Sequence, residues 1–131
     1  ALIQRETERG IPAHRIVAAG FSQGGAIAMH AALRYPESLA GLMALSTYLP
    51  LPESLDAEVI SNATAANRDI PIFMAHGSFD PVLPMQMGSD SARLLRAKDF
   101  EVEWHDYPMA HAVCAEEILH IRDWLLRVFA E

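Results

Sequence analysis

The feature that most constrains this chain is a serine between two glycines, at the junction of an apolar run and an alanine-rich run. Residues 20–24 read GFSQG and fit the pattern G-x-S-x-G, with a strand predicted before it and a helix after it. A strand that turns at once into a helix strains the backbone at the bend, so we expect both flanking positions to need residues without side chains. The bend projects the Ser22 hydroxyl away from the sheet. It also places the amide N–H of Gln23 at the positive end of the helix, where an oxyanion would form.

Four short apolar runs predict the strands around this serine, and they cover residues 15–21, 39–46, 70–77 and 101–108. The first three lack the polar–apolar alternation of a one-sided sheet, which is typical of parallel strands buried on both faces. The fourth alternates, which predicts a more exposed strand. Helical patterns follow the runs, so the order of elements indicates right-handed crossovers and a layered α/β fold.

The helical segments differ in how we expect them to pack. Small side chains on most sides of residues 24–35 allow that helix to lie close to the sheet, and residues 85–98 carry a few apolar side chains among polar ones. The last helix has the clearest pattern, and the residues expected to face the sheet are Ile118, Ile121, Leu125 and Val128. The residues expected on its other side are Glu117, His120, Arg122 and Asp123.

Two further segments complete the organisation of the chain. Residues 1–10 have the pattern of the last turns of a helix that ends near Gly10. Residues 47–69 are irregular at first and then helical in pattern, and we expect them to lie above the carboxyl ends of the strands. The sequence contains no repeat, low-complexity tract or linker, so residues 1–131 are predicted to form a single domain.

Composition and charge argue against several classes of protein. Hydrophobic residues make up 51% of the 131 residues and charged residues 21%, which is typical of a globular domain. The net charge of −7 and the lack of a basic run argue against a nucleic-acid partner. No stretch approaches the roughly 18 consecutive apolar residues of a membrane helix, so no stable membrane insertion is expected. Cys114 is the single cysteine, which rules out an internal disulfide and favours a reducing, cytoplasmic location.

A serine hydroxyl is a poor nucleophile until a base takes its proton, so the motif requires a histidine and an orienting carboxylate. The chain order for this kind of bend is serine, then acid, then histidine. Asp80 follows the third apolar run, and His111 follows the fourth. Because open α/β sheets place their sites at the carboxyl ends of the strands, we expect Ser22, Asp80 and His111 to meet at one edge of the sheet.

Other residues of the same types have competing interpretations. Asp106 is the alternative orienting acid, although it closely precedes the loop that carries His111. His76 is near Asp80 but ends a strand, which favours packing or a hydrogen bond to the loop. Cys114 is the alternative nucleophile, but lone cysteines are usually buried hydrophobic residues. The remaining histidines fit structural or solvated positions; they are His14, His30, His105 and His120. No H-E-x-x-H or other paired-ligand spacing occurs, so we expect neither a metal nor another cofactor.

With these residues in place, the chain resembles the bacterial carboxylesterase and acyl-protein thioesterase family of α/β-hydrolases. The matching segments are AAGFSQGGA, ALSTY, AHGSFDPVLP and WHDYPMAHAV, spread along nearly the whole chain. The resemblance implies the C-terminal part of an α/β-hydrolase fold, with a mostly parallel sheet and flanking helices. It places the family's nucleophile on Ser22, its acid on Asp80 and its base on His111. Members of the family hydrolyse short- to medium-chain carboxylic esters, and some act on thioesters or lysophospholipids.

The chain departs from the family pattern in two places. Ala110 stands where members commonly have glycine before the histidine, which puts the fine geometry of that loop in question. The family also carries an upstream strand and an H-G-x-G-type loop with a second oxyanion donor, and nothing in this sequence matches them. We therefore expect residues 1–131 to be the carboxyl-terminal part of a longer hydrolase, with residues 15–21 as an exposed apolar edge. Loss of one oxyanion donor costs on the order of 10²–10³ in rate, so we expect the isolated chain to be weakly active or inert.

These observations predict a serine hydrolase that cleaves carboxylic esters, with thioesters as a further candidate substrate, through an acyl-serine intermediate. The expected partner is a small ester substrate, and a homodimer is left open. One alternative is a truncated, non-catalytic α/β domain that binds a partner chain through its exposed edge. A chance match to G-x-S-x-G is a separate alternative for Ser22. A lipase or peptidase built on the same bend is the third alternative.

Overall fold

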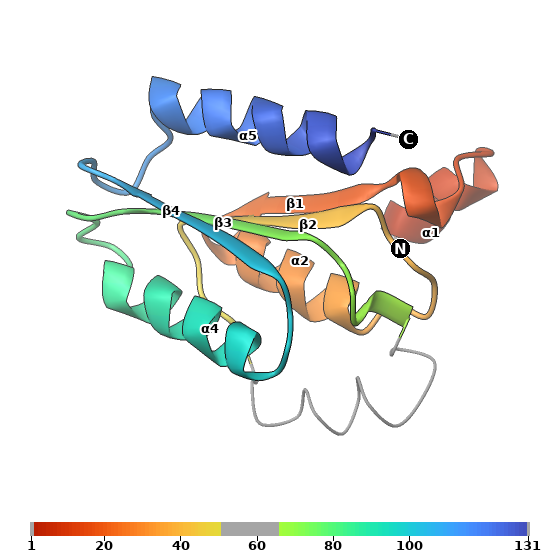
Figure 1. Ribbon diagram of the computed structural model, residues 1–131, viewed down its shortest axis with the longest axis horizontal. Coiled ribbons are helices and arrows are strands. Elements are labelled where there is room, and N and C mark those ends of the chain that lie inside the picture. The colour runs from red at the N-terminus through yellow and green to blue at the C-terminus, as the bar shows by residue number, and fades with distance from the viewer. Residues whose placement is uncertain (1, 51–65, 131) are drawn as a thin grey trace.

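The computed structural model describes residues 2–50 and 66–130. Its centre is a four-stranded parallel sheet in the order β1-β2-β3-β4 (Figure 1). The strands are β1 (Val17–Phe21), β2 (Gly41–Leu45), β3 (Ile72–Gly77) and β4 (Val102–Tyr107). These strands confirm the four predicted runs and the α/β class, and each strand is slightly shorter than its run.

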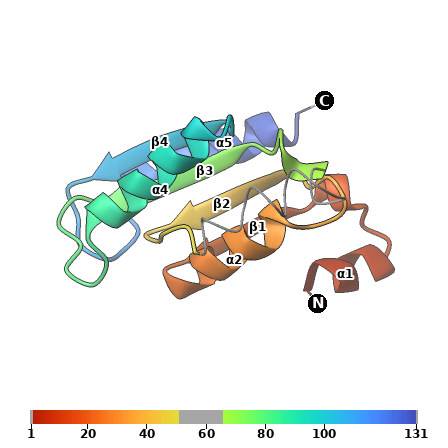
Figure 2. The same cartoon turned by 90° about the horizontal axis from the view of Figure 1, so that it is seen from below.

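Helices cover both faces of the sheet. The helices α2 (Gln23–Leu33) and α4 (Met85–Ala97) lie on one face, and α5 (Ala115–Val128) lies on the other (Figure 1, Figure 2). Each helix follows a strand directly in the chain, so β1-α2-β2 and β3-α4-β4 are crossover units between parallel neighbours. This arrangement brings the carboxyl ends of all four strands to one edge, where the loops after β1, β3 and β4 begin.

Two short helices precede the sheet. They are α1 (Leu2–Glu8) and the 3-10 helix η1 (Ala13–Arg15). Gly10 follows α1 with a φ of +101°, a backbone conformation that favours glycine, which confirms the predicted helix end. The prediction for residues 47–69 falls mostly on residues 51–65, which lie outside the described part of the chain. Within the described residues, no helix is both long and apolar enough to span a bilayer.

The alternation of side chains along β2 and β3 divides the core into two layers. The layer toward α2 and α4 contains Met29, Leu33, Leu42, Ala44, Ile72, Met74 and Leu95. The layer toward α5 contains Met43, Phe73, Ala75, Tyr107 and Trp124. The predicted burial on both faces is confirmed for β2 and β3. It is wrong for β1, whose residues are half-buried or exposed because β1 is the edge strand of the described sheet. β4 is largely half-buried, as its alternation predicts.

The helix α5 turns a different side to the sheet from the predicted one. Ile118 is 57% exposed, whereas Glu117 is 0% and Trp124 3% exposed. The predictions for Ile118 and Glu117 were therefore wrong. Trp124 lies two helical turns after Glu117, so burial of the large indole brings Glu117 to the same side of the helix. The other predicted residues of this face pack against the core; they are Ile121, Leu125 and Val128.

Candidate active site

Ser22 lies at the bend between β1 and α2, and its backbone is strained. Its φ is 57° and its ψ is −123°, a region that residues other than glycine rarely adopt. The Ser22 amide donates to the carbonyl of Leu45 in β2 at 2.8 Å, and the Ser22 carbonyl accepts from the amides of Gly25 and Ala26. The bend is thus held by the sheet on one side and by the first turn of the helix on the other.

The glycines around Ser22 do not contribute equally to this bend. A Cβ at Gly20 would lie 2.2 Å from the Gly24 carbonyl oxygen, and one at Gly25 would lie 2.7 Å from Thr47 Cγ2. A Cβ at Gly24 would meet no described atom within 4 Å. The expectation that both flanking positions exclude side chains is therefore met at Gly20 and wrong at Gly24. Gly25, just outside the five-residue motif, is the second position without room for a side chain, because its Cβ would also lie 2.9 Å from the Gly20 carbonyl oxygen of β1.

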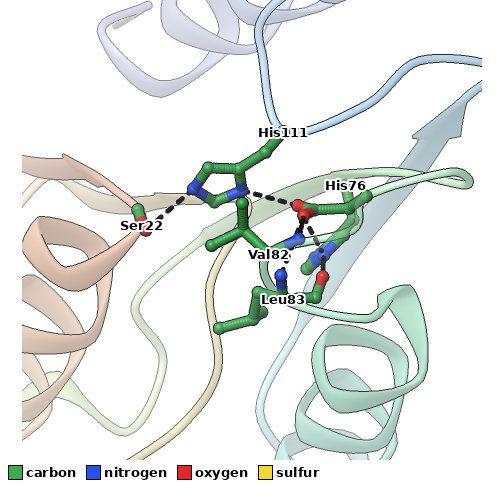
Figure 3. Close-up of polar contacts among 6 residues, drawn as sticks. Ser22, His76, Val82, Leu83 and His111 are labelled. Carbon is green, nitrogen blue, oxygen red and sulfur yellow. Dashed lines mark hydrogen bonds and ion pairs between the residues drawn. The ribbon is translucent and has the colours of Figure 1, made fainter.

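His111 lies between Ser22 and Asp80 and is hydrogen-bonded to both (Figure 3). Its Nε2 is 2.9 Å from Ser22 Oγ, and its Nδ1 is 2.6 Å from Asp80 Oδ2. An ionised carboxylate only accepts hydrogen bonds, so Nδ1 carries the proton and Nε2 is free to accept from the serine hydroxyl. The structure therefore brings together the three side chains that the sequence places after three different strands. In this arrangement the hydroxyl can pass its proton to the imidazole.

The environment of Asp80 keeps its side chain ionised. The carboxyl group is buried, and its Oδ1 accepts from the amides of Val82 at 2.9 Å and Leu83 at 2.8 Å. Burial acts to raise the pKa of Asp80, but the hydrogen bonds from these two amides and from His111 together hold the pKa below its usual 3.8. Asp80 is therefore a charged acceptor for the imidazole at neutral pH.

The loop that carries His111 rests directly on the backbone of Gly77. A Cβ at Gly77 would lie 2.2 Å from the Ala110 carbonyl oxygen and 2.3 Å from that of Met109. The Phe79 amide also donates to the Met109 carbonyl at 3.0 Å, which ties the Asp80 and His111 loops together. Ala110, the departure from the family pattern, is exposed, and His111 still reaches both of its partners.

A family model described as Phospholipase/Carboxylesterase matches residues 1–128. The chain belongs to the phospholipase/carboxylesterase family. Acyl-protein thioesterase 1 of Neurospora crassa is 44% identical over 125 residues, which cover 95% of this chain and 50% of that protein. The chain spans about half the length of the curated relatives it matches.

Solved structures of similar proteins share the fold of this phospholipase/carboxylesterase chain. SOBER1 of Arabidopsis thaliana superposes with a TM-score of 0.87 at 25% identity, covering 98% of this chain and 60% of that one. Esterase PE8 superposes with a TM-score of 0.85 at 26% identity, covering 98% of this chain and 57% of that one. The family and the fold that the sequence resemblance implies are therefore confirmed.

The rival residues in this family member have other contacts. Asp106 accepts a hydrogen bond from Trp104 Nε1 at 2.9 Å, and it makes none to His111 among the described contacts. Cys114 is half-buried at the start of α5. His105 stacks on His120 with 4.3 Å between the ring centroids, as expected for a packing role. Among the described residues, no group of three His, Cys, Asp or Glu side chains could hold a metal ion.

Three features of the site were missed by reasoning from the sequence. The ring of Phe21 packs on the His111 imidazole at 4.8 Å between centroids, and its place directly before Ser22 was the available signal. A glycine is needed at position 77 because the loop after β4 lies directly against its backbone. No pattern in the sequence around Gly77 indicates this contact. Val82 and Leu83 supply the amides that stabilise the Asp80 carboxylate, and the turn residues of the segment DPVLP were the signal for that.

Cavity volume does not locate this site. A cavity of about 620 Å³ is lined by Thr7, Pro12 and Glu37 among others, at the end of the molecule that holds the amino ends of the strands. Ser22 lies at the opposite, carboxyl end of β1. The candidate site is therefore identified by hydrogen-bond geometry.

Proposed function

We propose that this chain carries the centre of a serine hydrolase that cleaves carboxylic esters or thioesters through an acyl-serine intermediate. The observation that carries the proposal is the pair of hydrogen bonds made by His111, 2.9 Å to Ser22 Oγ and 2.6 Å to Asp80 Oδ2. Ser22 is the nucleophile, His111 the general base and Asp80 the orienting acid. The relative named acyl-protein thioesterase 1 and the structural neighbour named esterase PE8 support ester chemistry. Residues 1–131 act as one hydrolase domain in this proposal.

Acylation begins when Ser22 Oγ attacks the carbonyl carbon of the substrate while His111 Nε2 takes the hydroxyl proton. The imidazolium that forms keeps its Nδ1–H on Asp80, whose carboxylate stabilises the positive charge. The tetrahedral intermediate places its negative charge near the amide of Gln23, the first residue of α2. The first amides of a helix have no partner within the helix, so this N–H is available to the oxyanion. The intermediate collapses when the bond to the leaving oxygen or sulfur breaks, and His111 returns the proton to that atom.

Deacylation uses the same groups with water as the nucleophile. His111 Nε2 takes a proton from a water molecule, and the hydroxide attacks the acyl-serine carbonyl. The second tetrahedral intermediate releases the carboxylic acid when the bond to Ser22 Oγ breaks. The proton held by His111 returns to Ser22 Oγ, which restores the starting state.

Apolar side chains around the site support an acyl group of short to medium length as the part of the substrate that binds. Phe21 is 39% exposed beside His111, and Phe79 and Val82 are 70% and 68% exposed on the loop of Asp80. Ligand sites commonly combine apolar side chains with a few polar reactive groups, which is the combination found here. We propose that these apolar side chains contact the acyl chain. The net charge of −7 disfavours a nucleic acid as partner.

Labelling with a fluorophosphonate probe tests the proposed function directly, because the probe reacts with activated serines. We expect one covalent adduct on Ser22, absent in Ser22→Ala and strongly reduced in His111→Ala. Ser38→Ala, an exposed serine before β2, is the matched control and should label at the wild-type rate. A folded full-length protein whose Ser22 does not react would contradict the proposal and favour the partner-binding alternative. A series of p-nitrophenyl esters and matching thioesters, from acetyl to palmitoyl, then measures the preferred acyl length and leaving atom.

A further inference from the structure

His76 is a polar residue buried in an otherwise apolar strand face. Its neighbours on that face of β3, Ile72 and Met74, belong to the core layer toward α2 and α4. The His76 side chain is 1% exposed, and its ring stacks on that of Trp104 with 6.3 Å between centroids. A polar side chain in such a place costs free energy unless it is hydrogen-bonded, so this position needs a specific partner.

The partner of His76 is the loop that carries Asp80. His76 Nε2 is 2.8 Å from the Leu83 carbonyl oxygen and 3.4 Å from Asp80 Oδ2 (Figure 3). A carbonyl oxygen only accepts, so Nε2 carries a proton and donates it. The amide of the same residue, Leu83, donates to Asp80 Oδ1 at 2.8 Å. Leu83 therefore connects the two side chains, because its carbonyl is held by His76 and its amide is bonded to Asp80.

The other ring nitrogen of His76 makes no such contact. His76 Nδ1 is buried and has no hydrogen-bond partner among the described residues. Gly88, in the first turn of α4, lies against it, and a Cβ at Gly88 would be 2.4 Å from Nδ1. The missing side chain at Gly88 gives the imidazole room to direct Nε2 to the loop. A buried nitrogen without a hydrogen-bond partner costs free energy of folding. The hydrogen bond made by Nε2 must therefore offset this cost for a histidine to be present at position 76.

We infer that His76 is a positioning residue that acts on His111 through Asp80. Its Nε2–H fixes the carbonyl of Leu83, and the backbone of Leu83, so attached, keeps its amide in place to hold the Asp80 carboxylate in line with His111 Nδ1. Without this donor the loop loses its attachment to β3, and the carboxylate loses the geometry that orients the base. This inference rests on the proposed function, in which Asp80 orients His111.

Three substitutions at His76 distinguish between its two nitrogens. In His76→Gln the amide nitrogen reaches about as far as Nε2, in His76→Asn it reaches only as far as Nδ1, and His76→Leu has no donor. We expect the rate of fluorophosphonate labelling of Ser22 to fall about 10- to 100-fold in H76L and H76N, because small displacements of catalytic groups have effects of that size. H76Q should retain most of the rate. His14→Gln, an exposed histidine in η1, is the matched control.

The pH profile of labelling separates positioning from a loss of folded protein. Displacement of the Asp80 carboxylate breaks its 2.6 Å contact with His111 Nδ1, so the acid limb of the profile should move to lower pH in H76L and H76N. The limb should stay in place in H76Q. A variant that is only less stable would lower the amplitude of the profile without moving it. If H76L does not fold, the comparison of H76Q with H76N still tests whether His76 positions Asp80.

Gly88→Ala reaches the same ring from α4 without changing any group of the loop. Its methyl group should displace the imidazole through Nδ1, so we expect the slow labelling and the moved acid limb of H76N. The effect should be smaller when Gly88→Ala is combined with His76→Gln, because the ring atom that it pushes is then absent. Equal effects of Gly88→Ala in both backgrounds would contradict the inference.

A measurement that needs no reaction at Ser22 keeps the inference separate from the proposed function. A proton on His111 Nδ1, in a hydrogen bond of 2.6 Å to Asp80 Oδ2, should give a downfield resonance in proton NMR spectra. We expect this resonance in the wild-type protein and H76Q, and its loss or upfield shift in H76L and H76N. If this pattern appears but Ser22 does not label, the proposed function fails and the positioning of Asp80 stands. Wild-type labelling, acid limb and resonance in a folded H76L protein would overturn the inference.

Discussion

Gly77 and Ala110 are in backbone contact so close that a Cβ on Gly77 would lie 2.2 Å from the Ala110 carbonyl oxygen. The contact joins the end of β3 to the loop that carries His111, one residue later. Gly77→Ala must therefore displace that loop, since the obstructing atoms belong to the backbone. We expect the labelling rate of Ser22 to fall about 100-fold, as for other small displacements of a catalytic group. Labelling kinetics measure this, and circular dichroism shows that the variant is folded. A wild-type rate in the folded variant would contradict the role of this contact.

Asp80→Asn should have a much larger effect on reactivity. The neutral side-chain amide of the asparagine cannot balance the positive charge of the His111 imidazolium. Its nitrogen can also donate a hydrogen bond to His111 Nδ1, which favours the wrong tautomer of the imidazole. Loss of the orienting carboxylate in serine hydrolases costs on the order of 10⁴ in rate, and we expect a decrease of that order here. Asp106→Asn is the matched control because Asp106 accepts from Trp104 instead of His111. Its rate should stay within about twofold of wild type, and a larger loss than in Asp80→Asn would revive Asp106 as the orienting acid.

Asp80 should also make the stability of the fold depend on pH. Its pKa in the folded protein lies below the usual 3.8, because hydrogen bonds from two amides and His111 outweigh burial. A lowered pKa means that the folded state binds the proton less tightly than the unfolded state does. The stabilisation is therefore complete above pH 3.8 and is lost as the pH falls through the lower, folded-state pKa. Urea unfolding of wild type and Asp80→Asn between pH 7 and pH 2 measures it. We expect the difference in unfolding free energy to shrink at the acid end, and a constant difference would contradict the lowered pKa.

The sequence predicts those parts of the site that depend on strand ends. Ser22, Asp80 and His111 each follow a predicted strand, and parallel strands bring their carboxyl ends to one edge of the sheet. The bend at Ser22 is predictable too, since the close approach of Gly20 to Gly24 involves residues only a few positions apart. What the sequence could not supply is the set of contacts between loops. The fit of the His111 loop on Gly77 depends on residues that lie more than 30 positions apart in the chain.

The phase of α5 shows why a local pattern can mislead. The spacing of apolar residues favoured Ile118 for the buried face, although Ile118 is 57% exposed. Trp124 determines the phase instead, because it fills the space above β2 and β3 and contacts Phe73 at 5.7 Å between ring centroids. Counting apolar residues gives each the same weight, whereas the energy of burial follows their area. Burial of Trp124 therefore also buries Glu117, which lies on the same side of α5.

Glu117→Gln should stabilise the protein in a pH-dependent manner. Glu117 is 0% exposed, and neither carboxylate oxygen has a hydrogen-bond partner among the described residues. Burial raises its pKa above the usual 4.5, and the nearby Cys114 backbone and His105 only oppose this rise. The folded state therefore binds this proton more tightly than the unfolded state, and stability is lost as the pH rises through the raised pKa.

A glutamine at this position stays neutral and avoids that loss. We expect Glu117→Gln to exceed wild type in unfolding free energy by on the order of 1 kcal/mol at pH 8, and by less at pH 4. Glu116→Gln, the exposed neighbour in the same turn, should show no such pH dependence. Urea unfolding at several pH values compares the three proteins. If the gain of Glu117→Gln is as large at pH 4 as at pH 8, a charge on Glu117 is not its cause.

The two glycines of the G-x-S-x-G motif should respond differently to the same substitution. Gly20→Ala places a Cβ 2.2 Å from the Gly24 carbonyl oxygen, so the bend must open and Ser22 must move. We expect loss of labelling by about 100-fold or more, together with lower stability. Gly24→Ala meets no described atom within 4 Å and lies in the first turn of α2. Alanine is the better helix former, so Gly24→Ala should be neutral or stabilise the protein by up to about 1 kcal/mol. Labelling and thermal unfolding of the two variants test this contrast. Equal losses in both would mean that the motif constrains Gly24 through contacts other than those of the described residues.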